Sequence, residues 1–110
     1  MKGDFSKLTV WQRSIELAEL IYRFIPMLPQ EEKFALGNQM RRAVVSIPSN
    51  IAEGYGRRTE TEFIHFLHIA RGSNHELLSH MILCKLLFKL PDESMDEIFN
   101  NINQISKMLN

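Results

Sequence analysis

Arginine side chains gather in one part of the sequence. Five of the seven arginines lie between residues 41 and 71, namely Arg41, Arg42, Arg57, Arg58 and Arg71. A guanidinium group binds phosphate oxygens through paired N–H donors, so a row of exposed arginines can follow a nucleic-acid backbone. The alternative is that the same side chains pair with nearby carboxylates and hold helices or subunits together. Residue pattern leaves both interpretations open, and all five are candidate nucleic-acid-binding residues.

Other residue types that perform chemistry lack the companions they need. The stretch "EFIH", residues 62–65, has the Glu-x-x-His spacing of di-metal bundles, but those sites use the motif twice and add two glutamates. Ser46 and Ser49 have no histidine close in sequence to activate them. "GYGRR" lacks the lysine and spacing of a phosphate-binding loop. We therefore predict no catalytic residue, no metal site, no cofactor and no small-molecule substrate.

Length and composition indicate one folded domain, residues 1–110. The hydrophobic content of 45% is that of a globular protein, and thirteen basic residues balance thirteen acidic ones, so the chain as a whole has no net attraction to nucleic acid or membrane. Cys84 is the single cysteine, which excludes an intrachain disulfide; within "MILCKLLF" we expect a buried thiol. No signal-peptide run or membrane span is apparent, which predicts a cytoplasmic protein without membrane contact.

The first of four amphipathic segments begins at Thr9, where Thr9 and Gln12 have the spacing of a capping box. Its expected core face holds six residues at helical spacing: Trp11, Ile15, Ala18, Ile21, Tyr22 and Ile25. Pro26 and Pro29 end this helix.

A second helix is predicted from Gln30 to Ala52. One face is apolar: Leu36, Met40, Ala43, Val44, Ile47 and Ile51. Pro48 lies inside it and should bend the axis without splitting the helix, leaving the Val44 carbonyl to Ser46, Ser49 or water. Gly54 and Gly56 should close the helix in the left-handed conformation.

The third helix is predicted from Thr59, with Glu62 completing a capping box, to about Phe88. Its last turns, "MILCKLLFKL", are apolar nearly all the way round, so we expect a second subunit to cover one side.

The fourth helix is predicted to be capped by Asp92 or Ser94, and apolar residues recur along it: Met95, Ile98, Phe99, Ile102, Ile105 and Leu109. No segment alternates with period two. The sequence thus predicts an all-α protein, an up-down-up-down antiparallel four-helix bundle. In such a hairpin Arg42 and Arg71 should lie at similar height, with Arg57 and Arg58 in the turn.

Three stretches, "VWQRSIELAELIY", "LGNQMRRAVVSIPSNIAEGYGR" and "EFIHFLHIARGSNHEL", resemble the 23S rRNA intervening-sequence family, also called 23S ribosomal proteins. Asn74 departs from the family pattern, where an apolar residue is common. The resemblance implies an antiparallel four-helix bundle, a homopentamer, no enzyme activity, and a basic surface that binds RNA, DNA or a ribonucleoprotein. The alternative function is a structural or protein–protein assembly module without nucleic-acid binding.

Overall fold

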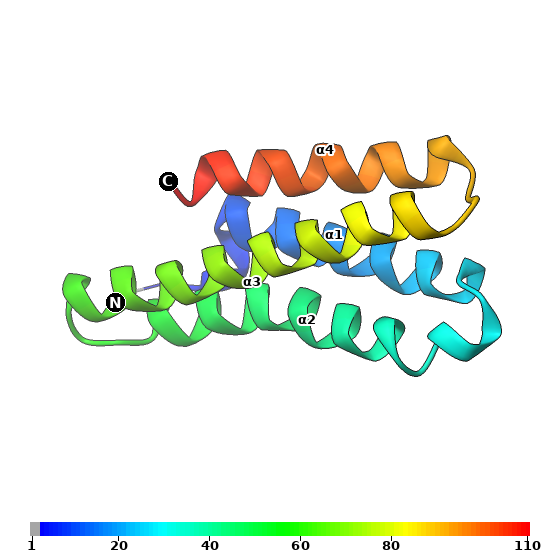
Figure 1. The fold of residues 1–110 in the computed structure, drawn as a ribbon. Helices are drawn as coiled ribbons and strands as arrows, with labels where there is room; N and C mark the ends of the chain where they lie inside the picture. The colour runs from blue at the N-terminus through cyan, green and yellow to red at the C-terminus, as the bar shows by residue number, and fades with distance from the viewer. Residues whose placement is uncertain (1–2) are drawn as a thin grey trace.

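Four long helices lie side by side in the computed structural model, which describes residues 3–110 (Figure 1). They are α1 (Thr9–Phe24), α2 (Leu36–Tyr55), α3 (Glu60–Leu87) and α4 (Asp92–Met108), with short 3-10 helices η1 (Phe5–Lys7), η2 (Ile25–Met27) and η3 (Gln30–Glu32). The described residues form no strand. The predicted all-α four-helix bundle is confirmed. Residues 1 and 2, which the predicted 1–110 domain includes, lie outside the described part.

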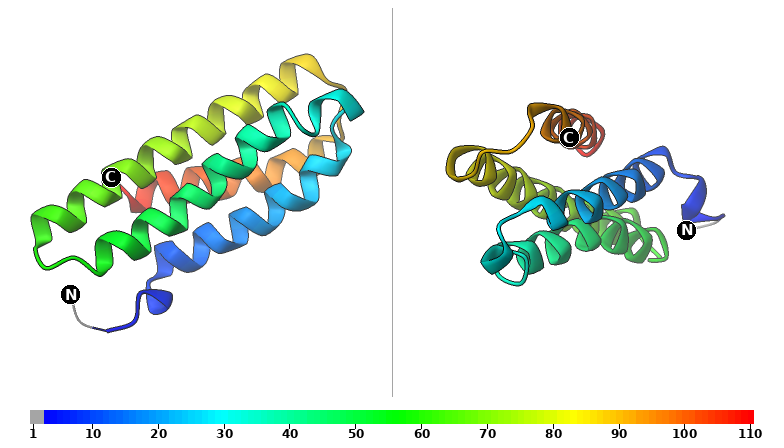
Figure 2. Two further views of the ribbon diagram at one scale, coloured as in Figure 1. Left: turned by 90° about the horizontal axis from the view of Figure 1, so that it is seen from below. Right: turned by 90° about the vertical axis from the view of Figure 1, so that its right-hand side faces the viewer.

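Consecutive helices run in alternating directions along an elongated body of 45 × 23 × 19 Å (Figure 1). The left view of Figure 2 shows that the turn between α2 and α3 projects beyond the C-terminal end of α4. This projection follows from the length of α3, which has 28 residues against 17 in α4. The α2–α3 hairpin is therefore the part of the bundle that reaches farthest into solvent at this end.

The core lies along the faces of α2 and α4 that periodicity predicts. All six apolar residues predicted to share one face of α2 are buried. On α4 the buried apolar residues are Met95, Ile98, Ile102 and Ile105, followed by Leu109, while Phe99 packs half-buried against them. Both faces follow the 3.6-residue repeat because a single apolar stripe exists on each helix.

The predicted core face of α1 is confirmed at Ile21 and Ile25, which are buried, and is wrong at its other positions. The buried residues of α1 are Ser14, Leu17, Ile21 and Phe24, whereas Tyr22 is 48% exposed. Trp11, Ile15 and Ala18 are only half-buried. Burial of Ser14 is possible because its hydroxyl donates to the Trp11 carbonyl at 2.7 Å. Because the buried face of α1 includes a serine, the pattern of apolar residues alone does not identify it.

Helix α1 begins at Thr9, as predicted, but the predicted N-caps of α1 and α4 lie later in the chain than the observed ones. Leu8 is the N-cap of α1 with no side-chain hydrogen bond, and Gln12 donates instead to the Ser6 carbonyl at 3.0 Å. The capping box at Thr9 is therefore wrong. Pro91 precedes α4, and Ser94 donates to the Pro91 carbonyl at 2.8 Å, so neither Asp92 nor Ser94 is the cap. Carboxylates in that first turn still complement the helix dipole.

Helix α2 begins at Leu36, six residues later than predicted, because η3 and a turn occupy the preceding segment. It continues unbroken through Pro48, as expected, while the bend stays a prediction. Neither Ser46 nor Ser49 donates to the Val44 carbonyl in the described chain; the Ser46 hydroxyl instead accepts from Asn50 Nδ2 at 2.9 Å. The polar groups near Pro48 are thus used in a hydrogen-bond network of their own.

The two glycines at the end of α2 act differently from the prediction. Gly54 lies inside the helix, and Gly56 is its C-cap with φ −81°, so neither takes the left-handed conformation. Gly54 is needed for space, since an added Cβ would lie 2.6 Å from the Cβ of Phe66. The capping box that opens α3 is confirmed: Thr59 Oγ1 accepts from the Glu62 backbone N–H at 3.1 Å, and Glu62 Oε1 accepts from the Thr59 N–H at 3.3 Å.

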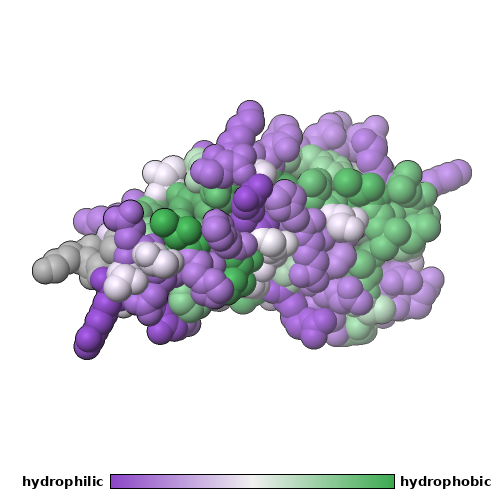
Figure 3. Space-filling model, turned by 60° about the vertical axis from the view of Figure 1, so that its left-hand side comes forward, coloured by the Kyte–Doolittle hydropathy of each residue, from purple (hydrophilic) through white to green (hydrophobic). Residues whose placement is uncertain are grey.

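The last turns of α3 are apolar on two sides, as predicted. Met81 and Cys84 point into the core, while the opposite side exposes Leu86 by 77% and Leu87 by 61%. Phe34, in the turn before α2, is 74% exposed. We call the exposed residues Phe34, Ile82, Leu83, Leu86 and Leu87 the apolar end patch. Figure 3 shows hydrophobic residues gathered over the end of the molecule remote from the N-terminus.

Candidate nucleic-acid interface

A hydrogen bond between Ser46 and Ser73 fixes the register of α2 against α3. The two hydroxyl oxygens are 2.8 Å apart. Arg42 precedes Ser46 by four residues and Arg71 precedes Ser73 by two, and the helices are antiparallel, so these offsets point in opposite directions. At the standard rise, Arg42 and Arg71 are about 9 Å apart along the axis. The expectation that they share one height is therefore wrong.

Arg71 also points away from the arginines of α2. Ser73 faces α2, and Arg71 precedes it by two residues, which at about 100° per residue places Arg71 on roughly the opposite side of α3. There Arg71 lies beside His68, Gly72 and His75 in an open cavity of about 250 Å³. The five candidate arginines consequently divide among separate surfaces instead of forming one line.

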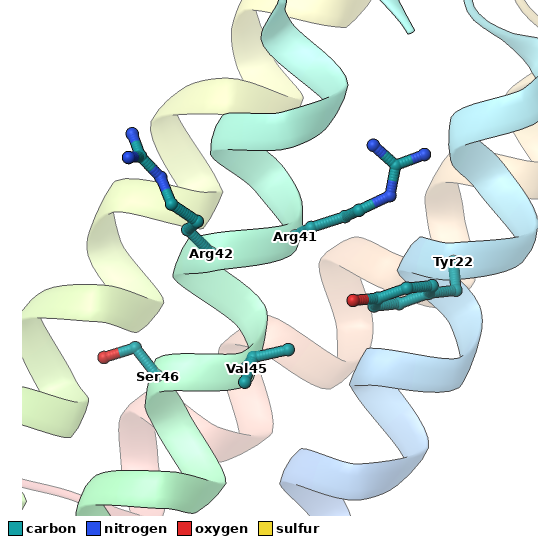
Figure 4. Close-up of a pocket in the computed structure, with 5 residues that line it drawn as sticks. All are labelled: Tyr22, Arg41, Arg42, Val45 and Ser46. Atoms are coloured by element: carbon teal, nitrogen blue, oxygen red, sulfur yellow. The ribbon is translucent and has the colours of Figure 1, made fainter. Parts of the chain in front are cut away.

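Arg41 and Arg42 diverge from neighbouring positions on α2 (Figure 4). Arg41 extends toward α1, with its guanidinium carbon 5.9 Å from the centre of the Tyr22 ring, and Arg42 extends toward the other side. Together with Val45 and Ser46, these three side chains line an open cavity of about 340 Å³. We call these five residues the α1–α2 surface.

The partners of Arg41 are neutral. Its Nη1 donates to the Lys33 carbonyl at 3.2 Å and to Asn38 Oδ1 at 2.6 Å. These bonds orient the guanidinium without cancelling its charge. Arg42 is exposed to solvent. The α1–α2 surface thus presents two cations, the hydrogen-bonded Arg41 beside the Tyr22 ring and the solvent-exposed Arg42.

The two arginines of the α2–α3 turn differ from each other. Arg57 Nη2 lies 2.7 Å from Glu53 Oε2, and the Arg57 guanidinium stacks over the Phe66 ring at 4.7 Å from its centre. Arg57 therefore helps to hold the hairpin together. Arg58 is exposed and forms no ion pair with any residue of the described chain.

Ion pairing distinguishes the two interpretations of the arginines. Residues 3–110 form two ion pairs between charged side chains, Arg13–Glu16 and Arg57–Glu53, and His80 also lies 3.8 Å from Glu76, a contact that is ionic only when the imidazole is protonated. Burial of Arg41, Arg42 and Arg71 against carboxylates would favour an assembly role alone. None of these three has a carboxylate partner in the part of the chain that the structure describes. Arg57 alone among the candidates is so paired.

Charge is unevenly distributed although the chain is neutral overall. Residues 33–58 hold Lys33 and four arginines against the single carboxylate of Glu53. Helix α4 has the opposite balance, with Asp92, Glu93, Asp96 and Glu97 against Lys107. A polarised surface of this kind attracts anions to the α2 side of the bundle.

Tyr22 is the member of this surface that periodicity does not identify, because the predicted core face of α1 includes it. Its exposure follows from the buried stripe of Leu17, Ile21 and Phe24, which turns Tyr22 outward. Recognition of that stripe places Tyr22 on the outer face of α1, and its position next to α2 follows from the packing of the two helices.

Two titratable groups in the core have shifted pKa values. The Cys84 thiol is fully buried, as predicted, and burial together with the negative charge of Glu32 raises its pKa to about 11. Burial lowers the pKa of His80, against the opposing effect of Glu76. Over residues 3–110, no three His, Cys, Asp or Glu side chains group as metal ligands.

No helix in the described segment combines the length and the apolar character needed to span a bilayer.

Comparison with known proteins agrees with the fold. The family model for the 23S rRNA-intervening sequence protein matches residues 6–110. A crystal structure of a protein of unknown function from the S23 ribosomal protein family of Bacteroides thetaiotaomicron VPI-5482 superimposes with a TM-score of 0.83. It is 25% identical, and the alignment covers 92% of this chain and 94% of that one. Curated proteins give no match. The chain belongs to the 23S rRNA-intervening sequence protein family.

Proposed function

We propose that this chain is a non-enzymatic protein that binds nucleic acid through the α1–α2 surface and the adjoining α2–α3 turn. The observation that supports it best is that Arg41, half-buried beside Tyr22, and the exposed Arg42 have no carboxylate partner in residues 3–110. Guanidinium groups bind phosphates, and an exposed aromatic ring can stack on an unpaired base. The family name, which refers to a sequence inserted in 23S rRNA, makes structured RNA the first ligand to test.

Fluorescence anisotropy with a structured RNA and with duplex DNA tests the proposal. We expect binding at micromolar protein that weakens steeply from about 50 to about 200 mM salt, because released counterions dominate such affinities. Arg42→Gln should lower the affinity and reduce the salt slope by about one. Arg23→Gln, which removes an exposed arginine of α1 outside this surface, is the matched control. Absence of salt-dependent binding would remove the proposal.

Self-association belongs to the same proposal and has its own support. Leu86, Leu87 and Phe34 expose large apolar side chains at one end of the bundle, which is unusual for a monomer. The homopentamer implied by the sequence resemblance would cover them. Multi-angle light scattering should give a mass well above the 12.9 kDa of one chain, and Leu86→Glu should lower it.

Ile64→Glu supplies the control for that experiment, since Ile64 is exposed on the same helix but outside the apolar end patch. An oligomer that binds neither RNA nor DNA would instead favour the assembly-module alternative. A cytoplasmic setting is part of the proposal, as a single cysteine offers no intrachain disulfide of the kind that secreted proteins use.

A further inference from the structure

Gly72 lies in the middle of α3, exposed to solvent, where no packing contact requires a glycine. A Cβ built at this position meets no atom within 4 Å, in contrast to Gly54, where a Cβ would collide with Phe66. Glycine weakens the interior of a helix relative to alanine. The described chain offers no compensating contact for Gly72. The effect of glycine at position 72 is therefore to leave open space above the surface of α3.

Nitrogen-bearing side chains surround this space. His68, Arg71 and His75 have the spacing i, i+3 and i+7, which puts them along one face of α3. With Gly72 they line the open cavity of about 250 Å³, and no carboxylate lines it with them. All three side chains are exposed, and none takes part in the ion pairs formed within residues 3–110.

The chemistry of this lining suits a tetrahedral oxyanion. Arg71 offers a planar fork of N–H donors, and an imidazole on either side adds a further N–H donor. A phosphate group has enough acceptor oxygens to use all three side chains at once, and its charge meets a cation without a competing carboxylate. The missing side chain at position 72 lets the group approach the helix surface.

We propose that His68, Arg71, Gly72 and His75 form a second binding site, specific for a phosphate group, on the side of α3 that faces away from α2. The site is separate from the α1–α2 surface and does not depend on it. The phosphate belongs either to a nucleic-acid strand or to a small phosphorylated molecule, and the recognition chemistry is the same for both.

The test is a nuclear magnetic resonance titration of the whole chain with inorganic phosphate near pH 6, with chloride at equal ionic strength as the reference. We expect phosphate, and not chloride, to shift the resonances of His68, Arg71 and His75 in a saturable way. Gly72→Leu fills the open space with a good helix former and should weaken phosphate binding about tenfold. Arg71→Lys keeps the charge but removes the planar fork, and should weaken it several-fold.

His65→Gln is the matched control, because His65 is an exposed histidine of α3 that does not line the cavity. It should leave the titration unchanged. Equal shifts with chloride, or unchanged phosphate binding in both Gly72→Leu and Arg71→Lys, would overturn the site.

A short single-stranded RNA identifies the source of the phosphate. Displacement of inorganic phosphate by RNA at these resonances assigns the site to a nucleic-acid strand, and phosphate binding that RNA leaves undisturbed assigns it to a small phosphorylated molecule. Arg42→Gln should not change the phosphate titration. The experiments can thus refute the phosphate site at the cavity and the nucleic-acid site at the α1–α2 surface independently of each other.

Discussion

Gly54 of α2 and Phe66 of α3 approach so closely that no side chain fits at position 54: an added Cβ would lie 2.6 Å from the Cβ of Phe66. The same Cβ would lie 3.0 Å from Cδ1 and 3.2 Å from the carbonyl oxygen of Phe63. The Phe66 ring in turn supports the guanidinium of Arg57. The close approach of the two helices therefore also positions an arginine of the turn.

Gly54→Ala is expected to destabilise the protein by about 1–3 kcal/mol, because two Cβ atoms fixed to their backbones cannot rotate apart. Urea unfolding followed by circular dichroism measures the change. Gly72→Ala, the same substitution where a Cβ meets nothing, should instead stabilise by up to about 1 kcal/mol through helix propensity. Equal unfolding free energies for the two variants would contradict the close contact.

The features that sequence predicted correctly are those with a local cause. The capping box of Thr59 and Glu62 involves two residues three apart, so no knowledge of the fold is needed to expect it. The faces of α2 and α4 each have one apolar stripe and no rival. In both cases the residues that decide the outcome lie within a few turns of each other.

The features that sequence missed depend on contacts between helices. Helix α1 has two overlapping apolar stripes, and only the position of its neighbours selects the one with Leu17 and Phe24 over the one with Tyr22. Gly54 looked like a helix end, whereas its role comes from Phe66, twelve residues later. Tertiary packing overrides such local signals.

The five candidate arginines are close together in the sequence, but they do not share one surface in the structure. Equal heights for Arg42 and Arg71 require α2 and α3 to be symmetrical about the turn, whereas the Ser46–Ser73 bond shows that the two helices are offset. The side of α3 on which Arg71 projects depends on the same register. Sequence therefore named the candidate residues and could not say which of them share a surface.

Because His80 is buried, we expect the protein to lose stability in mild acid. It is 8% exposed, its Nδ1 has no hydrogen-bond partner in the described chain, and burial lowers its pKa. The unfolded chain then binds a proton before the folded one as pH falls below about 6.5, so the free energy of unfolding should decrease from there downward.

His80→Gln removes this titration while keeping a polar side chain of similar length. Its unfolding free energy should depend less on pH than that of the parent between about pH 6.5 and about pH 5. Above about pH 8, where imidazole is neutral, the difference between the two proteins should be constant. Identical pH slopes would exclude His80 as the cause.

We expect the Cys84 thiol of the folded protein to react slowly with thiol reagents. Its pKa of about 11 leaves a thiolate fraction at pH 8 about a hundredfold smaller than that of an ordinary cysteine, and full burial adds steric exclusion. Ellman's reagent should therefore label the folded protein very slowly and the denatured protein at once. Fast labelling of the folded protein would show that α3 opens around Cys84.

We expect substitutions of Arg42 and Arg57 to have different effects on stability and on RNA affinity. Arg57→Gln removes the ion pair with Glu53 and the stacking on Phe66, which together contribute about 1 kcal/mol at an exposed site. Arg42→Gln removes an exposed cation and should change the unfolding free energy by less than about 0.5 kcal/mol. We expect RNA affinity to follow the opposite order, because Glu53 already offsets the charge of Arg57.

Glu53→Gln provides the complementary test of that order. Loss of this carboxylate releases the charge of Arg57 and removes the one acidic residue between positions 33 and 58, so RNA affinity should rise and the salt dependence should steepen. Anisotropy titrations of the three variants at matched salt measure this, alongside urea unfolding. If Arg42→Gln and Arg57→Gln weakened RNA binding equally, the α2–α3 turn would contribute as much to RNA binding as the α1–α2 surface. The α1–α2 surface would then not be the main phosphate-binding region.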